Sequence, residues 1–256
     1  MSTLTQTSTK HKVLTRPWLI GELLIVLALI KGYDYVRSLE AVRRLPALHN
    51  AQDLVAIERT LHLHFELAAN RWLALHDSLS VLMSYYYEYA HASVTICVLV
   101  CCYVWRPNAY RPARNALIIT NCVGMVIFVV LPVMPPRLLP HSHFIDSVAL
   151  AGFGSTHGGP VAADQYGAMP SLHLAWATWT AVMLWVMVRH RVLRVLAVIY
   201  PTVTAIVVLL TANHYLLDVF AGVLLALAAV ALTGVTAYAG RPVWWQPVKA
   251  PETAYR

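Results

Sequence analysis

Charged side chains are scarce in this sequence: of 256 residues, only 12% are Asp, Glu, Lys or Arg, whereas 59% are apolar. Soluble domains average about 25% charged and roughly 45–50% apolar residues. The shortage of charge therefore excludes a soluble globular protein. The long uncharged stretches have the length that crosses a bilayer, about 20 residues. We expect an all-α polytopic membrane protein in which residues 1–256 form one membrane-embedded domain.

Cysteine is also scarce. The chain has four, all within apolar stretches, where a small polarizable side chain packs well: Cys97, Cys101, Cys102 and Cys122. There is no small secreted domain for a disulfide framework to stabilise, so these residues do not indicate a redox compartment. The net charge of +7 lies in short connections between apolar stretches rather than in one basic patch. Nucleic acid is therefore not an expected partner.

Six apolar stretches are predicted to span the membrane: residues 17–30, 89–105, 115–136, 165–188, 195–217 and 219–240. No small-residue cleavage site follows Ile30, so the first stretch is interpreted as a spanning helix rather than a signal peptide. The last two stretches abut at Asp218. A turn is expected at residues 212–214, because one helix of their combined length would far exceed a bilayer core of about 30 Å.

Residues 41–77 are of mixed character, and their apolar positions recur every three or four residues, which indicates one helical face: Leu54, Ile57, Leu61, Phe65, Ala68 and Trp72. We predict an interfacial amphipathic helix with Asn50 as a possible N-cap. The charged residues Glu58, Arg59, Glu66 and Arg71 are expected to face water or each other. The alternative for Arg59 is an inward position near a bound anion.

Four tyrosines cluster where the second span should meet the outer interface, and they are expected to be membrane anchors rather than catalytic groups: Tyr85, Tyr86, Tyr87 and Tyr89.

Six spans would place both termini on one face of the membrane. That face would carry 12 of the 19 basic residues: Lys10, Lys12, Arg16, Arg106, Arg111, Arg114, Arg189, Arg191, Arg194, Arg241, Lys249 and Arg256. By the positive-inside rule it is cytoplasmic, with tails at about 1–16 and 241–256. The opposite face would hold the long Pro- and Gly-containing segment 132–170. A connection of that length is usually functional or disordered, and we favour a functional one.

Two short patterns begin predicted helices on that outer face: MPSLH at residues 169–173 and NHYLLD at residues 213–218. Positions four apart share a helical face, so Asp218 is expected to accept a hydrogen bond from one ring nitrogen of His214. The other nitrogen is then free to act as a nucleophile. An intramembrane Asp is costly and marks function more often than a structural pairing. His173 alone would be equally compatible with an ordinary helix start.

Two further residues on the same face are suited to binding an anion. The guanidinium of Arg137 can hold phosphate oxygens with two parallel hydrogen bonds, although an isolated Arg there would be expected to reach for lipid headgroups. The two histidines and the Asp beside it favour phosphate binding. Ser171 is expected to cap the helix, to donate to phosphate, or to do both, at a helix start whose unpaired N–H groups attract anions.

The PSLH and HYLLD patterns resemble the second and third motifs of the type 2 phosphatidic acid phosphatase superfamily, membrane-bound branch. Together with PPR at residues 135–137, they are most similar to its inositol phosphorylceramide synthase-like branch, over about residues 132–222. The resemblance implies that His214 attacks phosphorus, that Asp218 orients His214, and that His173 protonates the leaving oxygen.

The sequence departs from the classical phosphatases of that superfamily. Val130 stands seven residues before Arg137, where their first motif has Lys, and Val208 stands six residues before His214, where their third motif has Arg. Fewer cations favour a phosphodiester, which carries less charge than a phosphomonoester.

The expected function is that of a membrane lipid phosphatase or phosphotransferase. It would act on a lipid phosphate or phosphodiester through a phosphohistidine at the extracytoplasmic face, with no cofactor or metal. The acceptor, water or a sugar or polyol hydroxyl, is left open, as are the lipid and the oligomeric state. Residues 153–167 are a candidate lid.

Two other functions would use some of the same residues. A membrane haem protein would use His173 and His214 as axial ligands but leaves Asp218 and Arg137 unexplained. A transporter would predict internal repeats, and no convincing repeat relates the two halves of the sequence.

Overall fold

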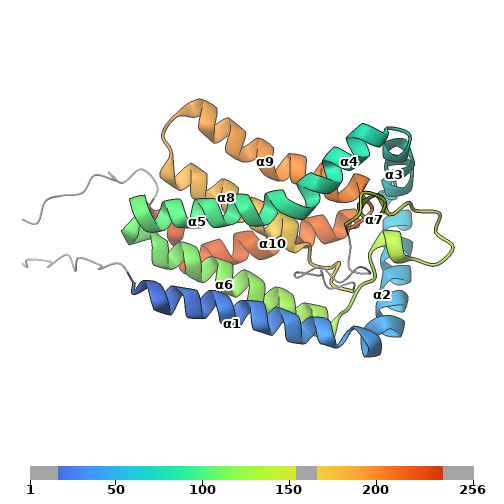
Figure 1. Ribbon diagram of the computed structural model, residues 1–256, viewed down its shortest axis with the longest axis horizontal. Helices are drawn as coiled ribbons and strands as arrows, with labels where there is room; N and C mark the ends of the chain where they lie inside the picture. Colours follow the sequence, from blue (N-terminus) through green and yellow to red (C-terminus); the bar gives the residue numbers. More distant parts are fainter. Residues whose placement is uncertain (1–16, 154–165, 239–256) are drawn as a thin grey trace, which may run out of the picture.

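The structure of the protein is a computed structural model that describes residues 17–153 and 166–238. Within these ranges the regular structure is helical, apart from one isolated β-bridge between Val133 and Gly167. The predicted all-α class is confirmed. Several helices run along the length of the molecule: α1 (Leu19–Ser38), α5 (His91–Trp105), α6 (Pro107–Val130), α8 (Leu172–Met187), α9 (Arg191–Leu210) and α10 (Leu216–Thr233) (Figure 1). Helix α2 (Glu40–Thr60) crosses one end of this bundle.

Four helical stretches are long and apolar enough to cross a membrane. One is the continuous stretch Asp77–Trp105, made of α4 (Asp77–Tyr85), the π-helical turn η1 (Tyr86–Ala90) and α5 (His91–Trp105). The other three are α6, α9 and α10. They correspond to the second, third, fifth and sixth predicted spans, and with this composition the chain is an integral membrane protein.

The first and fourth predicted spans remain predictions. Helix α8 (Leu172–Met187) is apolar but has only 16 residues. Helix α1 has 20 residues and carries several charged side chains. One of them, Glu22, is buried against α6, where it pairs with Arg114 and accepts a hydrogen bond of 2.8 Å from the Tyr110 hydroxyl. Such pairing lowers the cost of a charge at membrane depth.

The ends of the spans differ from the predicted ones. The third ends at Val130 rather than Pro136, because the prolines that follow cannot continue the helical hydrogen bonds. The fifth ends at Leu210, and α10 begins at Leu216. The predicted turn between them is confirmed, and Ala212 adopts a left-handed φ of 55° within it.

The single helix predicted over residues 41–77 is wrong. The structure has two helices, α2 (Glu40–Thr60) and α3 (Glu66–Ala74), and the chain reverses at His62, whose φ is 56°. Asn50 is not an N-cap: it lies within α2, and its amide donates a 2.8 Å hydrogen bond to the Pro132 carbonyl. The interfacial location of α2 and α3 stays a prediction.

Helix α8 packs against α5, α6, α9 and α10. The core between them combines the large side chains of Trp179 and Met183 with alanines such as Ala113 and Ala229. Small residues let helix backbones approach closely, and here the Trp179 indole N–H reaches the Ala113 carbonyl at 2.9 Å. This packing brings the beginning of α8 and the beginning of α10 together, and α10 also contacts the crossing helix α2.

Candidate active site

The start of α8 is fixed against the first turn of α10. Ser171 is the N-cap of α8, as predicted: its hydroxyl accepts a hydrogen bond from the backbone N–H of Leu174 at 3.4 Å. Its own backbone N–H donates to the carbonyl of Asp218 at 3.0 Å. His173, the second residue of α8, is thereby held beside the segment that carries His214.

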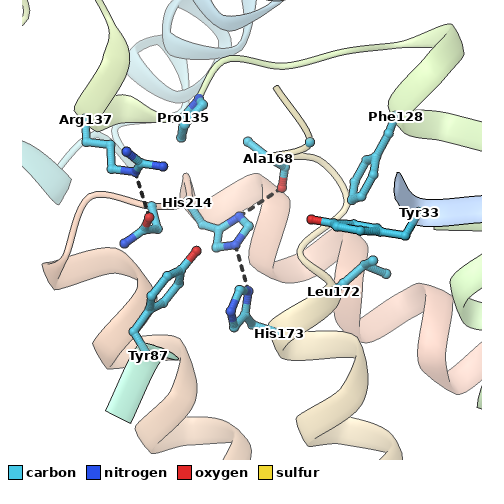
Figure 2. A pocket seen from close by; sticks show the side chains of 11 residues that line it. Tyr33, Tyr87, Phe128, Pro135, Arg137, Ala168, Leu172, His173 and His214 are labelled. Carbon is cyan, nitrogen blue, oxygen red and sulfur yellow. Dashed lines mark hydrogen bonds between the residues drawn. The ribbon is translucent and has the colours of Figure 1, made fainter. Parts of the chain in front are cut away.

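His214 lies in the turn between α9 and α10, where its backbone N–H donates to the Val208 carbonyl at 3.2 Å. Its buried ring places Nδ1 2.9 Å from the carbonyl oxygen of Ala168. A carbonyl only accepts, so Nδ1 carries a proton, and in the neutral ring Nε2 has the lone pair. Nε2 faces Nδ1 of His173 at 3.4 Å (Figure 2). When both rings are neutral, the proton between them therefore belongs to His173.

Asp218 is fully buried behind His214, but it does not hold the ring in the predicted way. Its Oδ2 accepts a hydrogen bond from the Tyr215 backbone N–H at 2.9 Å and lies 3.6 Å from His214 Nδ1. The hydrogen bond of that nitrogen goes to Ala168 instead. His214 precedes α10, so the two residues are four positions apart in the sequence but do not lie on one helix. The Asp218 carboxylate instead caps the start of α10. Its charge still acts on the imidazole at close range.

Arg137 joins the site through its backbone and its side chain. Its N–H donates to the Ala212 carbonyl at 2.9 Å, which ties η2 (Pro136–Leu138) to the turn before His214. Its Nε donates to Asn213 Oδ1 at 2.8 Å, and its Nη1 pairs with Asp146 Oδ2 at 2.8 Å. Within the described ranges Nη2 has no partner. Figure 2 places the guanidinium across the pocket from the two histidines.

Three of the five predicted site residues, Arg137, His173 and His214, line one pocket. A fourth, Asp218, lies directly behind His214. The lining residues are Tyr33, Tyr87, Phe128, Pro135, Arg137, Gly167, Ala168, Leu172, His173, Asn213 and His214. Ser171 supports the pocket as the cap of α8 and does not line it. A buried nucleophilic nitrogen, a second imidazole and an arginine in one pocket are suited to phosphoryl transfer.

Two aromatic neighbours of His173 were not predicted from the sequence. The ring of Tyr87 stacks on that of His173, with centroids 4.4 Å apart and planes at 22°. The ring of His91 lies 4.1 Å from it, and His91 Nδ1 is 3.0 Å from the Tyr87 carbonyl. The prediction that Tyr87 is a membrane anchor is wrong. The π-helical turn at Tyr86–Ala90 carries Tyr87, and such turns recur at functional sites.

Of the two positions expected for Glu58 and Glu66, facing water is wrong, because both are buried, whereas their carboxyl groups do lie against each other. Glu58 Oε1 accepts a hydrogen bond from the Leu217 backbone N–H at 2.9 Å, and Glu66 Oε1 accepts one from Leu216 at 3.1 Å. Side chains of α2 and α3 therefore cap α10 directly after His214. Burial, together with the nearby charges of Glu66 and Asp218, raises the pKa of Glu58 to about 8.

Arg59 is exposed and does not line the pocket, so the inward position weighed for it is not adopted. Most of the predicted lid, residues 154–165, lies outside the described residues. Phe153, at its start, packs edge-on against Tyr85 with centroids 4.7 Å apart. In the part of the chain that the structure describes, no three His, Cys, Asp or Glu side chains are grouped to hold a metal ion.

The paired-histidine pocket thus lies at one end of a bundle of apolar helices, where α8 and α10 begin. Residues 52–232 match the PAP2 superfamily, and the chain belongs to this family. The fold is similar to the crystal structure of LpxE from Aquifex aeolicus, with a TM-score of 0.52 and 17% sequence identity, over 67% of this chain and 93% of that chain. No curated protein sequence matches the chain significantly.

Proposed function

We propose that this protein is a membrane lipid phosphatase or phosphotransferase that forms a phosphohistidine on His214. The proposal rests chiefly on one observation: Nδ1 of His214 is committed to the Ala168 carbonyl, so Nε2 presents its lone pair to the pocket that holds His173 and Arg137. Membership of the PAP2 superfamily supports the same chemistry.

In the first step, His214 Nε2 attacks the phosphorus of the lipid and the bond from phosphorus to the lipid alkoxide breaks. His173, in its protonated form, gives its proton to that oxygen as general acid. In the second step, His173 takes a proton from the acceptor hydroxyl, whose oxygen attacks phosphorus and releases His214. The steps need no metal ion. Asp218, 3.6 Å from Nδ1, stabilises the positive charge that His214 gains.

Substrate binding must separate the two rings. His214 Nε2 and His173 Nδ1 are 3.4 Å apart, which leaves no space for a phosphoryl group between them. The phosphate therefore displaces the His173 ring from its hydrogen bond with His214. The same contact disfavours the haem alternative, because axial histidines stand on opposite faces of a macrocycle.

Negative charge that develops on the phosphoryl oxygens is stabilised by Arg137 and by the N-terminal end of α8, which Ser171 caps. Arg137 offers Nη2 to the substrate while Asn213 and Asp146 hold its other nitrogens. Asn213, next to His214, thus couples the position of the guanidinium to that of the nucleophile.

The acceptor decides between the two reactions. The PPR, PSLH and NHYxxD motifs are most similar to the inositol phosphorylceramide synthase-like branch, which favours transfer to a sugar or polyol hydroxyl over hydrolysis. Incubation with a lipid phosphate, with and without inositol, distinguishes the two: free phosphate indicates a phosphatase, and a new phospholipid indicates a transferase.

We further propose a six-span topology in which α1 and α8 also cross the cell membrane. Both termini are then cytoplasmic and the pocket lies at the extracytoplasmic face, because the connections opposite the pocket carry most of the basic residues.

The test of the proposal is His214→Ala in purified protein. The variant should lose turnover of every lipid phosphate that the native protein cleaves. Native protein given a lipid with radiolabelled phosphate should carry an acid-labile, base-stable label that the variant lacks. Substantial turnover by His214→Ala would end the assignment.

A further inference from the structure

We propose that Asp146, which no motif of the sequence indicated, makes the pocket selective for substrates with a single negative charge on phosphorus. Such substrates are phosphodiesters, in preference to phosphomonoesters. The inference rests on the proposed function, because it assumes that the pocket binds a lipid phosphate at Arg137.

The first observation is the ion pair itself. Asp146 Oδ2 lies 2.8 Å from Arg137 Nη1, and the two side chains are only 24% and 10% exposed. Charges that are largely shielded from water interact more strongly than charges in a surface pair. A substrate anion at Arg137 therefore meets a guanidinium whose charge is already offset by a carboxylate.

The second observation is that Asp146 is held in place. It is the N-cap of α7 (Ser147–Leu150), and its Oδ1 accepts a hydrogen bond from the Ala149 backbone N–H at 3.0 Å. The preceding residue, Ile145, is bound on both backbone groups by the Asn70 amide of α3, at 2.8 and 3.0 Å. Asp146 cannot easily swing away when an anion arrives, so its charge stays beside the substrate.

The third observation is the charge of the pocket. Among the described residues that line it, Arg137 is the one with a permanent charge, and Asp146 cancels it. Asp218, buried behind His214, adds a further negative charge. A dianionic phosphomonoester would bring two charges to a site with no net cation. A phosphodiester brings one, so the penalty for binding it is smaller.

The variant Asp146→Asn tests this inference. Asparagine keeps the shape and the capping ability of Asp146 but removes its charge. We would measure kcat/KM in detergent micelles for a monoester, phosphatidic acid, and for a diester, phosphatidylinositol. In the native protein the diester should be preferred. In Asp146→Asn the monoester-to-diester ratio should rise on the order of tenfold, the scale of a one-charge change beside a partly buried group.

Two controls separate charge from folding. Asp146→Ser keeps a capping hydroxyl, lacks the carboxylate and should shift the ratio in the same direction. Asp34→Asn removes a charge from the exposed pair with Lys31 and should leave the ratio unchanged. Inorganic phosphate, assayed as an inhibitor at a pH where it is a dianion, should bind more tightly to Asp146→Asn than to native protein.

A native preference for the monoester, or an unchanged ratio in both Asp146 variants, would overturn the role of Asp146 and leave the proposed function standing. Failure of the proposed function is seen differently: His214→Ala would then turn over these lipids as fast as the native protein does.

Discussion

A Cβ atom added to Gly222 would lie 2.2 Å from the carbonyl oxygen of Ser171, closer than real Cβ contacts ever come. Helix α10 can therefore rest on the N-cap of α8 because residue 222 has no side chain. This contact allows the hydrogen bond from Ser171 to the Asp218 carbonyl, and through it the two histidine-bearing segments keep a fixed relation.

We expect Gly222→Ala to push the start of α8 away from α10. Backbone atoms must move, so the variant should lose about 1–3 kcal/mol of stability and most of its turnover. Thermal unfolding in detergent and an activity assay check both effects. Gly21→Ala is the matched control: it adds the same methyl group to a helix at a place with nothing within 4 Å, and it should behave as the native protein does.

The buried Glu58 predicts how the stability of the folded protein depends on pH. Its pKa is raised from 4.5 to about 8 in the folded protein, so the folded state holds a proton that the unfolded state releases at lower pH. The stabilisation is fully present below about pH 4.5 and is lost as pH rises through about 8. Glu58→Gln, which mimics the protonated form, should flatten this dependence, which amounts to on the order of a few kcal/mol.

Thermal unfolding measured from pH 5 to pH 9 checks this prediction. Asp53→Asn, on the exposed face of the same helix, is the control and should keep the native slope. An equal slope in native protein and in Glu58→Gln would contradict the assignment of the buried proton to Glu58.

Asp218→Asn should fold but turn over slowly. The amide oxygen can still accept the hydrogen bond from Tyr215, and the Ala168 carbonyl still fixes the tautomer of His214. What is lost is the negative charge 3.6 Å from Nδ1, so kcat should fall roughly 10²-fold or more while KM changes little. Steady-state kinetics and a thermal melt separate this effect from unfolding. Near-native kcat would mean that Asp218 is only a helix cap.

The contribution of Tyr87 to catalysis should come from its aromatic ring rather than from its hydroxyl. Tyr87→Phe keeps the stack on His173 and should retain most of the activity, whereas Tyr87→Ala should lose about tenfold in kcat because the general acid is less well oriented. Tyr89→Ala, a change at an exposed tyrosine of the same stretch, is the control. If Tyr87→Phe were as slow as Tyr87→Ala, the hydroxyl rather than the stack would be the important group.

The sequence predicted those parts of the site that depend on short local patterns. Ser171 caps α8 because a Pro-Ser start favours a helix N-terminus, and the turn near Ala212 follows from the length of a bilayer span. Arg137 was found because an Arg after two prolines at a span end suits an anion. These features need only neighbouring residues for their explanation.

What sequence reasoning missed depends on contacts between distant segments. The hydrogen bond from His214 goes to Ala168, 46 positions earlier, and Glu58 caps a helix 159 positions later. A buried carboxylate and an exposed one look alike in an amphipathic pattern. Tyr87 enters the pocket because a single π-helical turn alters the rotation of its helix, which the tyrosine-rich sequence does not reveal.

The hydrogen bond between His173 and His214 has a consequence for the resting protein. As long as the rings touch, the reactive nitrogen is sealed, and stray electrophiles in the surrounding water have no access to it. Only an anion that binds tightly enough to separate the two imidazoles exposes this nitrogen. His214 therefore becomes reactive only when the pocket is occupied, and the resting protein is protected from modification between catalytic cycles.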